Sequence, residues 1–149
     1  MKKEENHKAV VIPVSFKSGK PRFLVVRDKR HKDWTFVTGG CRKREIFNPI
    51  RCALRELEEE TRGILNLTNI NYNYFKFTTR SLDNDEIRKE REKGVDLTLI
   101  YHVYVIETNL TRTDENTIIS KFNIEKEKTE ERRKNKQPIK RTYDENDFI

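Results

Sequence analysis

The sequence feature that most constrains this chain is an acidic run at residues 55–60, RELEEE, inside a segment that carries the signals of a helix. Asn48 can cap the start of this helix, and Pro49 suits its first position because that position has no intrahelical partner for a backbone N–H. Gly63 lies just past the expected end near Thr61. The chain must therefore place several carboxylates on one short helix.

Three of these glutamates share one face of the expected helix. Glu59 and Glu60 follow Glu56 by three and four positions, which at about 100° per residue puts all three on one stripe. The adjoining stripe is apolar and can face a core; it consists of Ile50, Ala53, Leu54 and Leu57. Like charges at these spacings repel each other. Either the acidic face is simply solvated, or a cation compensates it, from Arg55 or from a hard divalent metal.

The loop before the helix favours a ligand site over a solvated face. Residues 38–45, TGGCRKRE, begin with Gly39 and Gly40, which allow the backbone to approach a ligand or a metal closely. Glu45 adds a further acid directly before the helix. The cations of this loop are Arg42, Lys43 and Arg44. Metal-binding acids beside phosphate-binding bases are what phosphoryl chemistry needs, because a metal ion neutralises developing charge and activates water.

At these residues the sequence resembles the Nudix hydrolase family, whose signature reads G-x5-E-x7-R-E-U-x-E-E-x-G-U, where U is a bulky apolar residue. Gly39 and Glu45 match its first part, and residues 55–60 match its core. Nine residues instead of seven separate Glu45 from Arg55, which lengthens the loop before the helix. Arg62 stands where the signature has glycine, so the exit of the helix should differ.

The resemblance implies an α/β fold, a Nudix-type α/β/α sandwich with a mixed sheet and a catalytic loop and helix, as a single domain over residues 1–149. It also implies Mg2+ or Mn2+ as cofactor. Residues 34–45 and 48–57 are similar, more specifically, to the Nudix proteins of large cytoplasmic DNA viruses, which include mRNA-decapping enzymes, some also acting on diphosphoinositol polyphosphates. That similarity implies a cytoplasmic location, in the host if the protein is viral.

Roles for individual residues follow from the same resemblance. The implied metal ligands are Gly39, through its carbonyl, and Glu45, Glu56, Glu59 and Glu60. Glu56 could instead activate water, and Arg55 would orient the carboxylates; with Glu59 these are the implied catalytic residues. Nudix enzymes often add a glutamate from outside the signature. Of two candidates, Glu115 and Glu145, we favour the second because it lies in a compact acidic run near the end.

The distribution of charge along the chain helps to predict the class of substrate. The net charge is +7, and residues 1–67 account for all of it with 16 Lys/Arg against 9 Asp/Glu. A basic surface favours polyanions, although it also serves solubility. We expect capped RNA or an inositol pyrophosphate as substrate, bound by Arg42, Lys43 and Arg44 near the diphosphate and by Lys134, Lys136, Lys140 and Arg141 further along. A hydrolase of free nucleotides and a non-catalytic RNA-binding domain remain alternatives.

Aromatic residues that could stack on a methylated guanine, each also explained by core packing, are Trp34, Phe47, Tyr72 and Tyr74.

The remaining segments complete the expected fold. Strands are predicted at residues 8–16 and 22–27 (a hairpin), 34–38, 70–79 with one buried face, and 96–107 as a central strand that packs His102. Residues 83–93 read as a loop or an exposed helical turn, and part of 121–141 as an exposed helix ending before Pro138.

No apolar stretch approaches a membrane span, so we expect no membrane partner. Cys41 and Cys52 are too few for a disulfide framework, so we expect reduced thiols, no disulfide partner and no zinc site.

Overall fold

The protein is described by a computed structural model, which covers residues 2–67, 70–80 and 84–149. Its main sheet has five strands in the order β2-β1-β7-β6, with β5 also paired to β1. These strands are β1 (Lys2–Ser15), β2 (Arg22–Phe23), β5 (Val37–Gly40), β6 (Tyr72–Thr79) and β7 (Val95–Thr108). The two long strands, β1 and β7, run parallel along their whole length, whereas the other pairs are antiparallel. The sheet is therefore mixed, as predicted.

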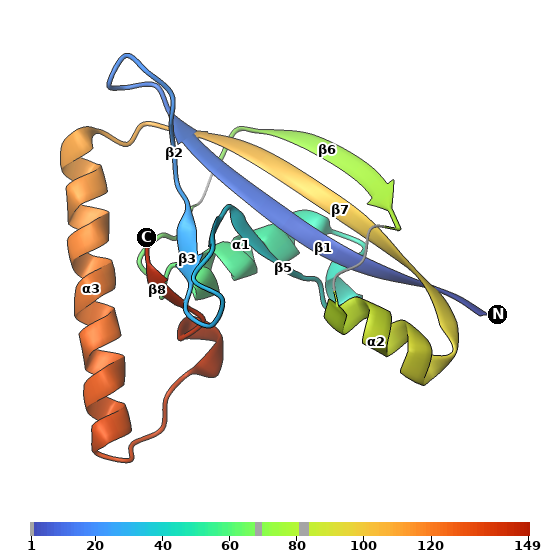
Figure 1. Ribbon diagram of the computed structural model, residues 1–149. Helices are drawn as coiled ribbons and strands as arrows, with labels where there is room; N and C mark the ends of the chain where they lie inside the picture. The colour runs from blue at the N-terminus through green and yellow to red at the C-terminus, as the bar shows by residue number, and fades with distance from the viewer. Residues whose placement is uncertain (1, 68–69, 81–83) are drawn as a thin grey trace.

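A second, three-stranded sheet lies beside the first, in the order β4-β3-β8. Its strands are β4 (Trp34–Thr35), β3 (Val26–Asp28) and β8 (Asn146–Phe148). The helices are η1 (Lys43–Glu45), α1 (Pro49–Glu60), α2 (Asn84–Lys93), α3 (Arg112–Lys134) and η2 (Arg141–Tyr143). Helix α3 extends away from the end of β7, on the side of β3 and β8 (Figure 1), and packs against β8. The α/β fold class predicted from the sequence is confirmed.

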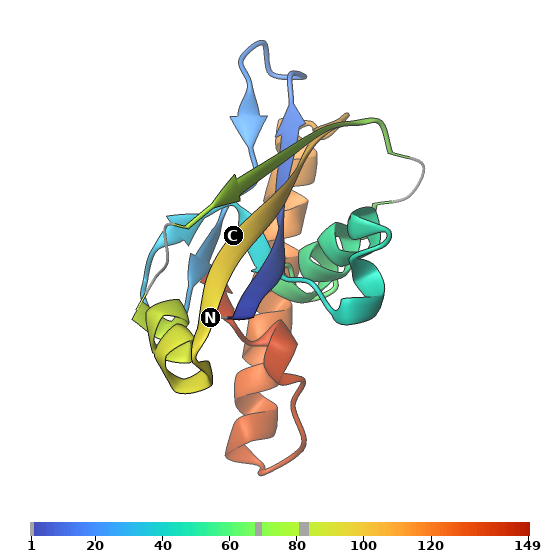
Figure 2. The ribbon, with the colours of Figure 1, turned by 90° about the vertical axis from the view of Figure 1, so that its right-hand side faces the viewer.

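Helix α1 covers one face of the main sheet, while α2 lies on the other side (Figure 2). The core forms where α1 meets β1 and β5, and Ala53 and Leu57 are completely buried in it, as the apolar stripe predicted. Burying a leucine side chain contributes about 1.5–3 kcal/mol. Because this contact fixes α1 on the sheet, it also fixes the direction in which the acidic stripe points.

Strand β7 is central, between β1 and β6, as expected. His102 is packed within it: its Nε2 lies 2.8 Å from Nδ1 of His7, and its Nδ1 lies 2.7 Å from the hydroxyl of Tyr74. The buried face predicted for residues 70–79 is wrong. Strand β6 ends the sheet and none of its residues is buried, because α1 covers β1 and β5 instead.

Two helical segments differ from expectation in extent. Residues 84–93 form a complete helix, α2, rather than a loop or a single turn. Helix α3 ends before Pro138, as predicted, but begins at Arg112, because Thr111 and Asp114 form a reciprocal capping box there. In the parts of the chain that the structure describes, no helix is long and apolar enough to cross a membrane.

Candidate active site

The acidic stripe of α1 faces the strand that leads into the glycine loop. Glu56 and Glu60 are buried, and the backbone N–H of Thr38 donates to Oε2 of Glu60 at 3.0 Å. Gly39 lies directly under Glu56: a Cβ added there would sit 2.0 Å from the carboxyl carbon of Glu56. Only glycine can therefore occupy position 39 while Glu56 keeps its place, which explains the glycine by close approach of a side chain.

Arg55 holds the acidic groups together. Its Nε and Nη2 each donate to Glu45 at 2.8 Å, and its Nη1 donates to Glu56 at 2.9 Å and to Glu59 at 3.1 Å. Nη2 also donates to the carbonyl of Gly40 at 3.0 Å. These bonds, above all those to Glu45, raise the pKa of Arg55. A single guanidinium thus contacts three carboxylates and the glycine loop.

Glu45 is committed to this arrangement. Both of its oxygens accept from Arg55, and Oε1 also accepts from the backbone N–H of Arg42 at 2.8 Å. The hydrogen bonds from Arg55 hold the pKa of Glu45 below its ordinary value. Glu45 therefore holds Arg55 in position through these hydrogen bonds. Its role as an auxiliary metal ligand stays a prediction.

The other carboxyls are less well compensated by positive charge than Glu45. Burial raises the pKa of Glu56 to about 7, with Arg55 opposing the shift. Burial, followed by repulsion from Glu56 and Glu145, raises the pKa of Glu60 to about 9. Partial desolvation and repulsion from Glu59 raise the pKa of Glu145 as well. The site therefore carries more negative charge than Arg55 neutralises.

This donor set fits a hard divalent cation. Carboxylate oxygens and a nearby backbone carbonyl are the ligands that Mg2+ and Mn2+ prefer. Among the described residues, no three acidic, histidine or cysteine side chains already converge on one metal position. Arg55 accounts for this, because it draws Glu45, Glu56 and Glu59 toward its own nitrogens.

The two candidates for an additional glutamate lie in different places. Glu145 precedes β8 and is an electrostatic neighbour of Glu56, Glu59 and Glu60. Glu115 lies in the first turn of α3, where it pairs with Arg22 at 2.7 Å. The structure thus brings the preferred candidate to the acidic stripe and keeps the other away from it.

Arg62 is a residue whose importance the sequence did not reveal. It has a left-handed backbone with φ of 58° and is buried. Its Nη2 donates to the carbonyl of Asn146 at 2.7 Å and to Asp144 at 3.2 Å, and its guanidinium lies 5.2 Å from the ring of Phe122. Arg62 therefore ties the end of α1 to the residues on both sides of Glu145. Its position in place of the signature glycine was the only signal in the sequence.

The predicted basic residues divide into two groups. Arg42 lies 3.8 Å from Glu59, and Lys43 and Arg44 are exposed on η1 beside it. The second group is exposed at the end of α3 and in the segment that follows; it consists of Lys134, Lys136, Lys140 and Arg141. This segment returns to α1 through Tyr143, whose hydroxyl donates to Glu58 at 2.8 Å.

The prediction of reduced thiols is wrong. Cys41 and Cys52 form a disulfide, with Cα atoms 5.3 Å apart across a sequence separation of 11. The glycine loop turns back after η1, so Cys41 meets the buried first turn of α1, where Cys52 lies. Counting cysteines could not reveal this contact, because it depends on the course of the loop. The bond closes a covalent ring that contains Glu45.

Comparisons with known proteins place this geometry in context. The family model described as "NUDIX domain" matches residues 5–142. The NUDIX domain of Shewanella oneidensis NrtR, solved in complex with ADP ribose, superposes with a TM-score of 0.53 at 13% identity, covering 73% of this chain and 64% of that one. A MutT/nudix family protein from Enterococcus faecalis gives a TM-score of 0.53 at 15% identity, covering 72% of this chain and 38% of that one. The chain thus spans less than two thirds of either protein. The comparison with curated proteins gave no match.

Proposed function

Because the chain belongs to the NUDIX domain family, we propose that it is a metal-dependent hydrolase that cleaves a phosphoanhydride bond in a nucleoside diphosphate derivative. The observation that carries this proposal is the acidic stripe of α1, held by Arg55 above Gly39 with Glu56 and Glu60 buried. Burying several carboxyl groups this close together costs stability unless a cation compensates them.

The proposed metal ligands are the carboxylates of Glu59, Glu60 and Glu145 and the backbone oxygen of Gly39. When bound, Mg2+ or Mn2+ would neutralise the diphosphate and acidify water. Through Nη1, which donates to both carboxylates, Arg55 would hold Glu56 and Glu59 in position beside the loop. Arg42, Lys43 and Arg44 would bind the phosphate oxygens that point away from the carboxylates.

Glu56 is the proposed general base. Its Oε1 accepts from Arg55, while its Oε2 has no hydrogen-bond partner among the described residues. A pKa of about 7 suits a group that must accept a proton at neutral pH and release it afterwards. The attacking water would therefore lose its proton to Oε2 of Glu56.

For the substrate, we propose the 5′ cap of mRNA or a diphosphoinositol polyphosphate. Support comes from the basic surface, with 16 Lys/Arg against 9 Asp/Glu in residues 1–67. The ADP ribose bound by the Shewanella oneidensis domain supports the wider class of nucleoside diphosphate derivatives. A housecleaning activity on free nucleotides is the second candidate. The complete acidic stripe argues against a non-catalytic RNA-binding domain.

A substrate panel with Mg2+ or Mn2+ tests the proposal. It comprises capped RNA, inositol pyrophosphates, dinucleoside polyphosphates and nucleoside triphosphates, each with and without excess chelator. We expect metal-dependent release of a phosphate-containing product, abolished in Glu59→Gln and retained in Glu107→Gln, a control on the exposed end of β7. Full activity in chelator, or near-normal turnover by Glu59→Gln, would refute the assignment.

The second basic group allows the RNA substrate to be tested separately. Replacing Lys134, Lys136, Lys140 and Arg141 by alanine should weaken cleavage of a capped RNA of about 30 nucleotides. The salt dependence should also become shallower, by roughly 0.7 in log–log slope for each phosphate that is no longer neutralised. Cleavage of a cap dinucleotide should hardly change, because it cannot reach this segment. Equal losses on both substrates, or none, would mean that these residues are an ordinary solvated surface.

A further inference from the structure

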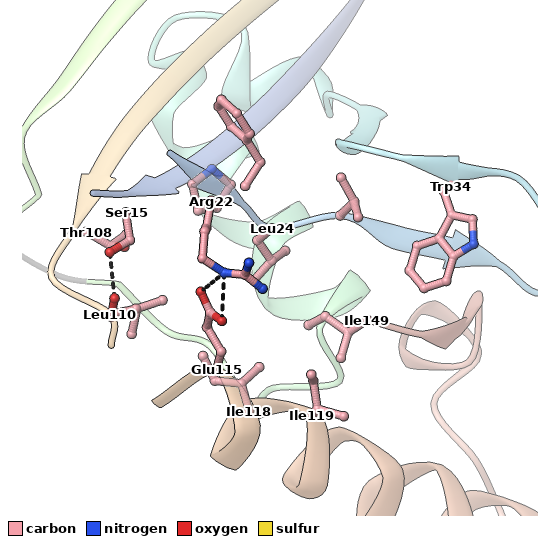
Figure 3. A pocket seen from close by; sticks show the side chains of 13 residues that line it. Ser15, Arg22, Leu24, Trp34, Thr108, Leu110, Glu115, Ile118, Ile119 and Ile149 are labelled. Carbon is pink, nitrogen blue, oxygen red and sulfur yellow. Dashed lines mark hydrogen bonds and ion pairs between the residues drawn. The ribbon is translucent and has the colours of Figure 1, made fainter. Parts of the chain in front are cut away.

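A cavity lies away from the acidic stripe, between the first turns of α3 and the strands β2 and β4 (Figure 3). Its volume is about 200 Å³, and its lining is mainly apolar. The indole of Trp34 forms one wall, and Ile118 of α3 and the terminal residue Ile149 contribute to the others. An apolar cavity of roughly 150 Å³ is enough to bind benzene, so this one can admit a flat aromatic ring.

The aromatic side chains that line the cavity are exposed to solvent. Trp34 is 54% exposed and the neighbouring Phe23 is 52% exposed, although both line the cavity. An exposed tryptophan beside an open cavity offers a large flat surface on which a base can stack. This wall therefore favours a planar ligand.

The polar side of the cavity is oriented in advance. Nε of Arg22 donates to both carboxylate oxygens of Glu115, at 2.7 and 2.9 Å, and Figure 3 shows the guanidinium lying between this carboxylate and the cavity. Within the described residues, no acceptor lies within hydrogen-bond distance of the two terminal amino groups of Arg22. Glu115 thus fixes a guanidinium whose donors remain available to a ligand. Because arginine can only donate, the ligand edge must present acceptors.

Two extended segments connect this cavity to the acidic stripe. Glu145 and Ile149 are separated by four positions along β8, which at about 3.3 Å per residue is roughly 13 Å. Gly39 and Trp34 are separated by five positions along β5 and β4, or roughly 16 Å. Since the chain cannot reach further than these lengths, they are upper limits, and a sugar with a short phosphate chain can bridge such a span between the cavity and the carboxylates.

We propose that this cavity is the base-binding site of the substrate and that it selects guanine, with Trp34 stacking on the ring and Arg22 donating to O6. Guanine presents the acceptor O6 at a position where adenine presents the donor N6 amino group, and O6 stays an acceptor when N7 is methylated, as it is in the cap. The inference rests on the proposed function only in joining this base to the phosphates cleaved at the acidic stripe. Binding of the base itself is independent of cleavage.

Fluorescence tests the site without turnover. Trp34 is the only tryptophan, so its emission reports on the cavity alone. GMP and AMP contain no phosphoanhydride bond and cannot be substrates. We expect GMP to quench the emission saturably and AMP to bind at least about tenfold more weakly, because adenine presents an amino group to the guanidinium where guanine presents O6. The same titration of free N-acetyltryptophanamide corrects for absorption by the nucleotide.

Variants separate the two parts of the site. Arg22→Gln should remove the preference for GMP while stacking persists, and Arg88→Gln, an exposed arginine on α2, should leave the preference unchanged. No quenching by GMP, equal quenching by AMP, or an unchanged preference in Arg22→Gln would each overturn the proposal.

The outcome also distinguishes this inference from the proposed function. If GMP binds as expected but the substrate panel gives no hydrolysis, the base site stands and the hydrolase fails. If guanosine substrates are hydrolysed while Trp34 does not respond to GMP and Trp34→Ala leaves their KM unchanged, the hydrolase stands and the base site fails. Phe75→Ala, an equally exposed aromatic on β6, is the matched control for KM.

Discussion

Replacing Arg62 by the glycine of the Nudix signature should destabilise this protein, although glycine suits the local backbone better. With φ of 58°, Arg62 adopts a left-handed conformation that costs a side chain-bearing residue roughly 1–2 kcal/mol. Glycine would remove that cost. It would also remove the hydrogen bonds to Asn146 and Asp144 and the contact with Phe122. Stability therefore depends on which effect is larger.

The contacts outweigh the strain. A hydrogen bond from a charged group contributes about 1.5–3 kcal/mol, and a partly desolvated cation–π contact about 1–2 kcal/mol. Asp144 keeps Lys29 and Arg133 as partners, so no unpaired charge is left behind. Adding the two hydrogen bonds and the ring contact and subtracting the relieved strain leaves a net destabilisation of about 4.5 kcal/mol. For a chain of this length that corresponds to a Tm lower by about 9–18 °C.

Thermal and urea denaturation of Arg62→Gly measure this difference. The matched control is Lys136→Gly, because Lys136 is also left-handed, with φ of 54°, but is exposed after the end of α3. The control should be neutral or slightly stabilised. Activity of Arg62→Gly should also fall, since Arg62 holds both neighbours of Glu145. If Arg62→Gly were as stable as the unmodified protein, the view that Arg62 ties α1 to the C-terminal segment would be wrong.

Three further predictions concern the active-site loop and helix. Reducing the disulfide between Cys41 and Cys52 should lower the free energy of unfolding by about 3 kcal/mol, the loop-closure entropy expected for a separation of 11 residues. The measurement is the urea midpoint with and without reductant, and a variant with serine at both positions is the control. A midpoint that does not respond to reductant would contradict this prediction. Gly39→Ala should lower kcat about 100-fold by displacing Glu56, as expected for a misplacement of about 1 Å. The Tm should change little. A near-normal kcat would show that catalysis does not depend on the position of Glu56 over Gly39. Because the pKa of Glu60 is raised to about 9 from an ordinary 4.5, the folded state holds the extra proton, and stability in chelator should fall as pH rises through that window. Glu60→Gln should flatten this dependence, and an equal slope in both proteins would refute the assignment.

The parts of the site that follow from helical periodicity could be predicted from the sequence. The spacing of Glu56, Glu59 and Glu60 predicted one acidic stripe, and Ala53 and Leu57 predicted the buried stripe beside it. Both depend only on the 3.6-residue period and on which face meets the sheet. The central position of β7 followed equally from its length and its apolar content.

Features that depend on tertiary neighbours could not be predicted in this way. Alternation along residues 70–79 identified a strand, but it could not show that no helix covers β6. The disulfide between Cys41 and Cys52 depends on the turn that the loop makes after η1. Arg62 illustrates the same limit, since its partners are more than 60 positions away in the chain.

The longer spacing between Glu45 and Arg55 shows what the signature requires physically. Despite two additional residues, Arg55 still makes both of its hydrogen bonds to Glu45 at 2.8 Å. The extra length is directed to solvent, where Phe47 is 94% exposed, while the disulfide from Cys41 to Cys52 brings the two ends of the loop together. The requirement is thus the contact between the carboxylate and the guanidinium, which orients the acidic stripe, and not the number of residues that separates them. A loop closed by a covalent bond can be lengthened without releasing this contact, because the added residues do not lie between the two groups in space.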